Sequence, residues 1–201
     1  MIDLTYNIED KICLFPGSQK YISSTKENSS SFIVDSHYGT HIDAPSHFIE
    51  NGRNISEINH DMFFGKVQII TIKSKIIDKD LLKSLKIKLD RVFFNCIDND
   101  MLKPFNYDYA ALNESGAKYI VKNNIKMVGI NYVSIERFYN NDYTQNKKFL
   151  AHKKLLKNNV LIVEGLKLSN VKDGIYEYVL LPLKTYKEAS LTRIFLKSKL
   201  K

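Results

Sequence analysis

The amino-acid sequence predicts an α/β or α+β domain built around a mixed sheet or a partly closed barrel. Strand-length segments rich in Ile, Val and Phe alternate with helix-length segments, and the strands are in excess. The 201 residues contain no internal repeat, low-complexity linker or sharp shift in composition. A chain of this length fits one domain with a sizeable core, so a single domain over residues 1–201 is expected.

Seven segments are expected to be strands because β-branched and aromatic residues are frequent in them. The strongest is GKVQIITIKS (65–74), whereas VLIVEG (160–165) is short, apolar and ends in a carboxylate. In chain order the seven are SFIVDS (31–36), GKVQIITIKS (65–74), RVFFNC (91–96), IKMVGI (125–130), VLIVEG (160–165), IYEYVLLPL (175–183) and LTRIFLK (191–197).

Three helices are predicted, over DKDLLKSL (78–85), NYDYAALNESGAKYIVKNN (106–124) and LAHKKLLKNN (150–159). Asp78 or Asp80 is expected to cap the first, because a side-chain carboxylate accepts from the free N–H groups of a first turn. The second is expected to be largely helical, with Gly116 marking a break.

The composition argues against nucleic acid and a membrane as partners. The net charge is +8, but the basic residues are mostly scattered lysines, with only four arginines and no arginine cluster. No run of about 18 apolar residues is present, so no transmembrane helix is expected. The segment MIDLTYNIEDKICLF (1–15) is acidic as well as apolar and lacks the layout of a signal peptide. Cys13 and Cys96 are isolated thiols, which predicts a cytoplasmic protein.

The segment DSHYGTHIDAPSHF (35–48) holds three of the five histidines, His37, His41 and His47, together with Asp43. Two neutral imidazoles and a carboxylate suit Zn²⁺, Mn²⁺ or Fe²⁺. Three protein ligands leave coordination positions open for water, which is typical of a catalytic rather than a structural metal site.

Gly39 and Pro45 disfavour a regular helix across this segment, so a turn through residues 38–40 followed by an extended stretch is expected. In an extended stretch the side chains of residues i and i+2 share a face, which places His41 and Asp43 together. A turn before them can then bring His37 to the same point.

Two residues further along the chain are candidates to complete the site. His152 stands at the start of a predicted helix, and Glu164 closes an apolar segment. A buried carboxylate is costly unless it is paired or bound to a metal, so Glu164 is either a ligand or half of an ion pair at the sheet edge. His60 has no such neighbours in the sequence and is interpreted as a surface or interface residue.

HYGTHIDAPSHF (37–48) resembles the His-x-Gly-Thr-His-x-Asp-Ala-Pro-x-His-Phe signature of the cyclase family of metal-dependent hydrolases, which includes bacterial kynurenine formamidase and isatin hydrolase. AHKKLLKNNVLIVEGLKLSNV (151–171) is similar to the second block of that family. MVGINYVSIE (127–136) and LLPLKTYKEASLTR (180–193) resemble two further family segments. The resemblance therefore covers nearly the whole chain.

The resemblance implies a site for two divalent ions, with Zn²⁺ ahead of Mn²⁺. The first ion would be bound through the N-terminal cluster and the second through the downstream histidine, with Asp43 and Glu164 bridging or shared. His47 matches the catalytic histidine of the family, which donates and accepts a proton. The implied metal ligands are His37, His41, Asp43, His152 and Glu164.

The family fold is a swivelling β/β/α-type domain with flanking helices, usually assembled as homodimers or homotetramers. The implied reaction is hydrolysis of a C–N amide bond of a small molecule by a metal-activated water with His47 as acid and base. The default substrate is an arylformamide of the N-formylkynurenine type. The alternatives are a cyclic amide of the isatin type, or a non-catalytic family member that binds a metal or ligand.

Two departures from the family pattern leave the metal ligands intact and concern the specific substrate. Kynurenine formamidase places a tryptophan against its aromatic substrate, but this chain contains no tryptophan. Phe15, Tyr6 and Tyr21 are the candidates for its place, with Phe15 first. The aspartate of the family segment Gly-Ile-Asp is Asn131 here.

Overall fold

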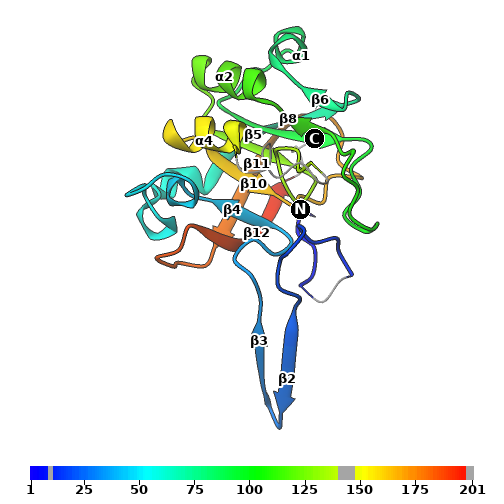
Figure 1. Cartoon of the computed structure of the whole chain (residues 1–201), viewed down its shortest axis with the longest axis vertical. Helices are drawn as coiled ribbons and strands as arrows, with labels where there is room; N and C mark the ends of the chain where they lie inside the picture. The colour runs from blue at the N-terminus through cyan, green and yellow to red at the C-terminus, as the bar shows by residue number, and fades with distance from the viewer. Residues whose placement is uncertain (9–10, 140–147, 198–201) are drawn as a thin grey trace.

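The computed structural model describes residues 1–8, 11–139 and 148–197. Its main element is an eight-stranded mixed sheet with the order β1-β12-β11-β5-β7-β9-β10-β4 (Figure 1). A further pairing of β12 with β4 closes seven of these strands into a barrel and leaves β1 outside it. The strands are β1 (Ile2–Asp3), β4 (His41–Asp43), β5 (Phe64–Ile72), β7 (Arg91–Cys96), β9 (Met127–Ile130), β10 (Leu161–Glu164), β11 (Gly174–Pro182) and β12 (Ala189–Lys197).

The barrel combines a parallel and an antiparallel part. β5, β7, β9 and β10 are parallel neighbours, and the other pairings in the sheet are antiparallel. Each parallel connection contains a helix, as parallel strands require a crossover. The α-helices of the described residues lie together on one side of the barrel (Figure 1). They are α1 (Lys79–Ser84), α2 (Glu114–Lys122) and α4 (Leu150–Lys157).

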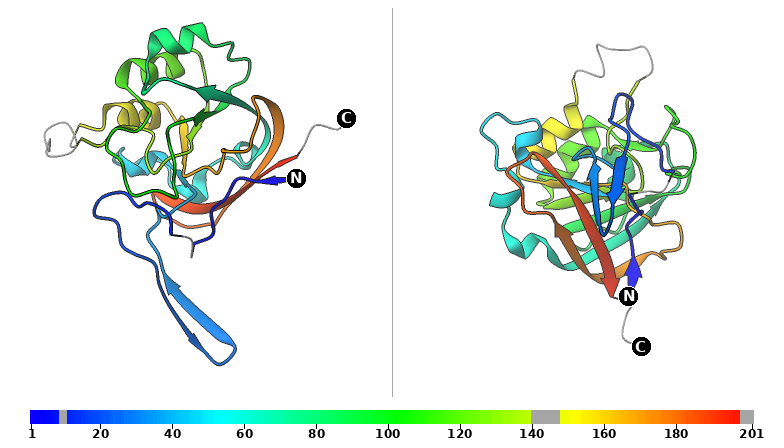
Figure 2. Two further views of the ribbon diagram at one scale, coloured as in Figure 1. Left: turned by 90° about the vertical axis from the view of Figure 1, so that its right-hand side faces the viewer. Right: turned by 90° about the horizontal axis from the view of Figure 1, so that it is seen from below.

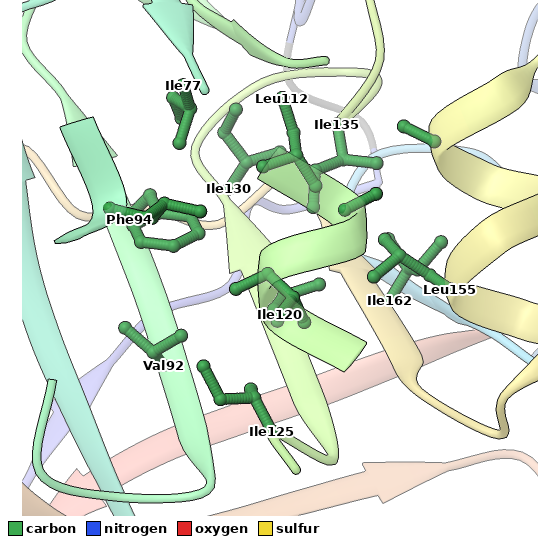
Figure 3. Packing of buried hydrophobic residues seen from close by; sticks show 14 of the residues in the cluster. Ile77, Val92, Phe94, Leu112, Ile120, Ile125, Ile130, Ile135, Leu155 and Ile162 are labelled. Atoms are coloured by element: carbon green, nitrogen blue, oxygen red, sulfur yellow. The ribbon is translucent and has the colours of Figure 1, made fainter. Parts of the chain in front are cut away.

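Side chains alternate between the two faces of the strands and so form two large hydrophobic cores. Val92, Phe94 and Cys96 of β7 point toward the helices, whereas Phe93 points into the barrel. Figure 3 shows the helix-side core, in which Ile120 of α2 and Leu155 of α4 pack over the strands. Because the parallel strands are covered on both faces, they carry nearly continuous apolar runs. The mixed sheet, the barrel and the flanking helices are therefore confirmed.

The predicted helix over 106–124 is confirmed only in its second half. The structure has a helix only from Glu114, and Ala111–Leu112 form the short strand β8, which pairs with β6 (Ile76–Ile77). Asn113 caps the helix by accepting from the N–H of Gly116. The helix continues through Gly116, so the break predicted at this residue is wrong. A Cβ at this position would meet the carbonyl of Ile77, so glycine allows the helix to pack closely against β6.

A β-hairpin projects from the barrel (Figure 1 and the left view of Figure 2). It consists of β2 (Ile22–Lys26) and β3 (Ser29–Ile33), and all ten of these residues are exposed. The predicted strand over 31–36 is thus confirmed only in its first half. Ile22, Phe32 and Ile33 leave large apolar side chains in solvent.

Three short 3₁₀ helices, η1 (Pro45–His47), η2 (Ile55–Glu57) and η3 (His60–Met62), follow β4. None of the helices in the described ranges is both long and apolar enough to span a bilayer.

Asn131, which replaces the family aspartate, ties together the ends of two parallel strands. Its side-chain oxygen accepts from the N–H of Cys96 at 2.8 Å, and its amide group donates to the carbonyls of Cys96 (3.0 Å) and Asn99 (3.3 Å). The residue is buried. An aspartate could accept the first of these bonds but could not donate the other two.

We therefore expect Asn131→Asp to lower the free energy of unfolding by about 2–4 kcal/mol, since two carbonyl oxygens would face a buried carboxylate. Urea unfolding of both proteins measures the difference. Asn106→Asp is the control, because exposed Asn106 uses its side-chain oxygen as an acceptor for the N–H of Asp108. That variant should stay within about 0.5 kcal/mol of wild type. Equal stability of N131D and wild type would contradict the expectation.

Candidate metal centre

The position of β4 between β10 and β12 decides where its side chains point. The antiparallel register places His41 opposite Glu164 of β10. Ile42 points into the barrel. Because alternate residues of a strand face opposite sides, His41 and Asp43 share the other face, and Glu164 lies beside them on the neighbouring strand. The register thus brings one histidine and two carboxylates together.

The turn before β4 is fixed by a close contact between two glycines. Gly39 (φ +60°) and Gly165 (φ +66°) both adopt the left-handed conformation, and a Cβ on Gly165 would collide with the carbonyl of Gly39. Thr40 donates from its hydroxyl to the carbonyl of Gly165 at 2.7 Å. This contact holds the segment that carries His37 against the end of β10, as the turn predicted over 38–40 requires.

The structure brings the N-terminal histidines and Asp43 into one group. Nδ1 of His37 lies 3.1 Å from Oδ1 of Asp43, and Nε2 of His41 lies 3.5 Å from the same oxygen. His41 and Asp43 are buried, whereas the side chain of His37 is 23% exposed. These three residues offer ligand atoms that all lie within 4.8 Å of one another.

A second group shares Asp43 with the first. It contains Asp43, His152 and Glu164, whose ligand atoms also lie within 4.8 Å of one another. Nε2 of His152 is 3.3 Å from Oε1 of Glu164, and Nε2 of His41 is 3.4 Å from Oε2 of Glu164. Glu164 therefore faces a histidine with each of its oxygens. The structure thus brings all five sequence-predicted ligands into one cluster.

Hydrogen bonds orient the histidine rings. Nδ1 of His41 is 3.0 Å from the carbonyl of Gly39, and Nδ1 of His152 is 2.9 Å from Oε2 of Glu136. A carbonyl or carboxylate oxygen can only accept, so Nδ1 carries the proton in each ring. The Nε2 atoms then direct their lone pairs at Asp43 and Glu164, an arrangement typical of metal-binding histidines.

The donor set fits a divalent metal ion. Within the part of the chain that the structure describes, Nε2 of His41 and both carboxylate oxygens of Asp43 are buried atoms without a hydrogen-bond partner. The contact of His37 with Oδ1 of Asp43 is an ion pair when the ring is protonated. Unpartnered buried lone pairs that converge are costly unless a cation accepts them. Imidazole and carboxylate donors suit Zn²⁺ and Mn²⁺ alike.

The pKa values show how strongly negative the centre is. Burial by itself would lower the pKa of His37, but Asp43, Glu164 and Glu188 raise it to about 9. Burial likewise opposes the charged form of Asp43, yet His37 and the other histidines hold the pKa of this carboxyl well below its usual range. The buried carboxylates thus require positive charge beside them, which protons or a divalent cation can supply.

His47 lies at the edge of the cluster. It ends η1, whose first residue is Pro45, and its side chain is partly exposed. Its ring centroid is 4.3 Å from that of His37 and 6.1 Å from that of His152. Burial lowers its pKa to about 4, the charge of Asp43 opposes this, and His37 and His152 reinforce it. His47 is therefore next to both groups without belonging to either.

Two further candidate residues, Phe15 and His60, have aromatic neighbours. Phe15 packs edge-on against Phe138 and Phe105, with ring centroids 4.8 and 6.4 Å away. His60, on η3, is exposed and lies near Phe63. Phe48 and Phe149 lie beside one of the predicted ligands. Their ring centroids are 5.3 and 5.7 Å from that of His152.

Two carboxylates of the centre were not predicted from the sequence. Glu136 pairs with His152, and Glu188 lies 3.4 Å from Nε2 of His37 and accepts from the hydroxyl of Ser36 at 2.8 Å. Both residues lie in segments that resemble the family, 127–136 and 180–193. This resemblance is the signal in the sequence that could have indicated them.

Comparisons with known proteins identify the family to which the chain is similar. A family model described as putative cyclase matches residues 2–137. Cyclase-like protein 3 of Oryza sativa subsp. japonica is 31% identical over 81% of this chain, and the match covers 62% of that protein. Kynurenine formamidase of Bacillus cereus is 28% identical over 90% of this chain and 89% of its own length.

Solved structures share the fold. One described as a potential metal-dependent hydrolase with cyclase activity superposes with a TM-score of 0.85 and 28% identity, covering 97% of this chain and 96% of that one. Isatin hydrolase A of Labrenzia aggregata has a TM-score of 0.73 at 16% identity, over 98% and 93% of the two chains. At that identity the second likeness concerns the fold alone.

Proposed function

Because this chain belongs to the putative cyclase family, we propose that it is a metal-dependent hydrolase that cleaves the C–N bond of a small amide. The default substrate is an arylformamide of the N-formylkynurenine type, which the similarity to kynurenine formamidase supports. The observation that carries the proposal is that two groups of possible ligand residues, all of them buried except His37, share Asp43.

The proposed cofactor is a pair of divalent ions, Zn²⁺ or, second, Mn²⁺. His37 and His41 would hold one ion and His152 the other, with Asp43 and Glu164 shared between them. Such a pair, when bound, supplies a water of lowered pKa and polarises a carbonyl oxygen. The shared carboxylates are fully surrounded by protein, so the ions would be held in an environment of low dielectric that strengthens their electrostatic effect.

His47 is the proposed acid and base. An amine leaves an amide poorly unless it is protonated, so the reaction requires a side chain that takes a proton from the attacking water and delivers it to the nitrogen. His47 lies between the rings of His37 and His152, and its partial exposure leaves it accessible to substrate. Because its pKa is lowered to about 4, the ring is neutral at pH 7 and free to accept the proton, and once protonated it donates readily to the leaving nitrogen.

Phe48 and Phe149 offer an aromatic surface beside the ligands. Their ring centroids are 5.0 Å apart, and both rings lie next to His152. Both side chains are only partly buried. We assign the contact with the aryl group of the substrate to this pair before Phe15, whose ring packs against Phe138 and Phe105.

Metal removal tests the function. Chelation followed by dialysis should abolish hydrolysis of N-formyl arylamines, and Zn²⁺ or Mn²⁺ should restore it. Elemental analysis before chelation should find about two ions per chain, as a two-metal site requires. Circular dichroism of the stripped protein controls for unfolding. Unchanged turnover in metal-free, folded protein would rule out the proposal, whereas preference for a cyclic amide in the same assay would replace the default substrate only.

The proposal places the enzyme in the cytoplasm as an oligomer of identical chains. Cys13 and Cys96 are free and buried, which suits a reducing compartment. Assembly into homodimers or homotetramers is supported by the projecting hairpin, because an isolated two-stranded hairpin is only marginally stable in water. Its exposed Ile22, Phe32 and Ile33 would be covered by a partner subunit.

A further inference from the structure

Glu136 is a largely buried carboxylate that takes no part in the chemistry proposed above. Its side chain is 15% exposed and lies in the segment after β9. Oε1 accepts from the backbone N–H of Ala151 at 3.0 Å, and Oε2 accepts from that of His152 at 3.0 Å. Oε2 also lies 2.9 Å from Nδ1 of His152. Three donors at the start of α4 therefore converge on one side chain.

Helix α4 has no cap of its own. The residue at its N-cap is Phe149, which adopts φ +40° and provides no side-chain acceptor. The first N–H groups of a helix need acceptors from outside the helix, and a carboxylate there also interacts favourably with the helix dipole. Glu136 supplies this carboxylate from a different segment, so the position of the helix start depends on it.

The same carboxylate decides which nitrogen of His152 is free. Because a carboxylate accepts and does not donate, Nδ1 must carry the proton that points to Glu136. Nε2 then faces Glu164 at 3.3 Å. A flip of the ring would exchange Nδ1 with Cδ2 and Nε2 with Cε1, which would break the bond to Glu136 and point a carbon at the ligand group. The contact thus selects both the tautomer and the orientation of the ring.

We propose that Glu136 is a positioning residue for the second metal ion, acting through His152. It orients Nε2 toward Asp43 and Glu164, and it holds the helix that carries the ring. The inference rests on the proposed two-metal site. Loss of the residue that hydrogen-bonds a metal-binding histidine typically lowers metal affinity by 10–100-fold. The positioning role therefore explains why the centre contains this carboxylate in addition to its ligands.

The test is Glu136→Gln, a nearly isosteric change that removes the charge and one of the two acceptor oxygens. Zinc titration of the metal-free full chain against a competing chelator measures the affinity of each site. We expect one of the two affinities to fall about 10–100-fold and the other to stay within about twofold of wild type. Unchanged affinity at both sites would overturn the proposal.

A double-mutant cycle with His152→Ala separates positioning from helix capping. H152A should retain only the first zinc site, and adding E136Q to it should leave that affinity unchanged. If E136Q weakens zinc binding equally with and without His152, Glu136 acts on the fold in general and the proposal fails. Glu57→Gln is the matched control. Exposed Glu57 caps η2 by accepting from the N–H of Asn54 at 2.9 Å, and its loss should leave both zinc affinities unchanged.

A measurement on the wild-type chain keeps the test independent of how E136Q folds. Nitrogen-15 NMR of the zinc-loaded protein should show His152 protonated at Nδ1, with slow exchange of this proton, and bound to zinc through Nε2. Coordination through Nδ1 would overturn the proposal. None of these measurements involves hydrolysis. A chain that gives the expected zinc results but cleaves no amide would contradict the proposed function and support the role of Glu136.

Discussion

Asp43→Asn is expected to lower the affinity for both metal ions by at least about 100-fold, more than loss of an outer partner does. Asp43 is the one residue that belongs to both ligand groups, and neither of its oxygens has a hydrogen-bond partner among the described residues. An asparagine offers one oxygen in place of two, and its amide hydrogens would point toward a cation. The shared position makes this single substitution act on both sites.

The expected loss is measured as zinc per chain after dialysis against metal-free buffer. The fold should persist, because backbone pairing with β10 and β12 holds β4 on both sides and asparagine has nearly the same size as aspartate. Asp61→Asn, on η3, is the control, since exposed Asp61 lies outside both ligand groups. Wild-type zinc content in D43N would mean that Asp43 is not a ligand of either ion.

The ligands on β4 could be predicted from the sequence because their arrangement is local. The period of two along a strand places His41 and Asp43 on one face, and Gly39 marks the turn that brings His37 to them. The contact with Glu164 is different. It depends on the register between β4 and β10, which are more than 100 residues apart, and no local pattern specifies that register. Only the family resemblance indicated it.

Glu136 and Glu188 illustrate what a single sequence does not reveal. Each is an ordinary carboxylate by its neighbours in the chain, and each acquires a role through a residue distant in the chain, His152 and His37 respectively. The same limit explains the error over 106–124. The apolar residues before Asn113 were compatible with a helix, but pairing with β6 provides backbone hydrogen bonds that favour a strand.

His47→Ala is expected to lower kcat for an N-formyl arylamine by about 10²–10⁴-fold, the usual contribution of a positioned acid or base. Metal content should stay at the wild-type value, because His47 belongs to neither ligand group. Stability should change little, since the side chain is partly exposed at the edge of the cluster. Turnover at saturating substrate and zinc per chain are measured on the same preparation.

His60→Ala is the control for H47A. His60 is the histidine on exposed η3, away from both ligand groups, so removing it controls for the loss of an imidazole as such. H60A should keep wild-type turnover. If H47A also keeps it, proton transfer does not pass through His47. If H47A loses zinc together with activity, His47 is a ligand rather than the acid and base. Loss of turnover with both ions retained is the outcome that a proton-transfer role predicts, because the ring lies beside His37 and His152 but belongs to neither ligand group.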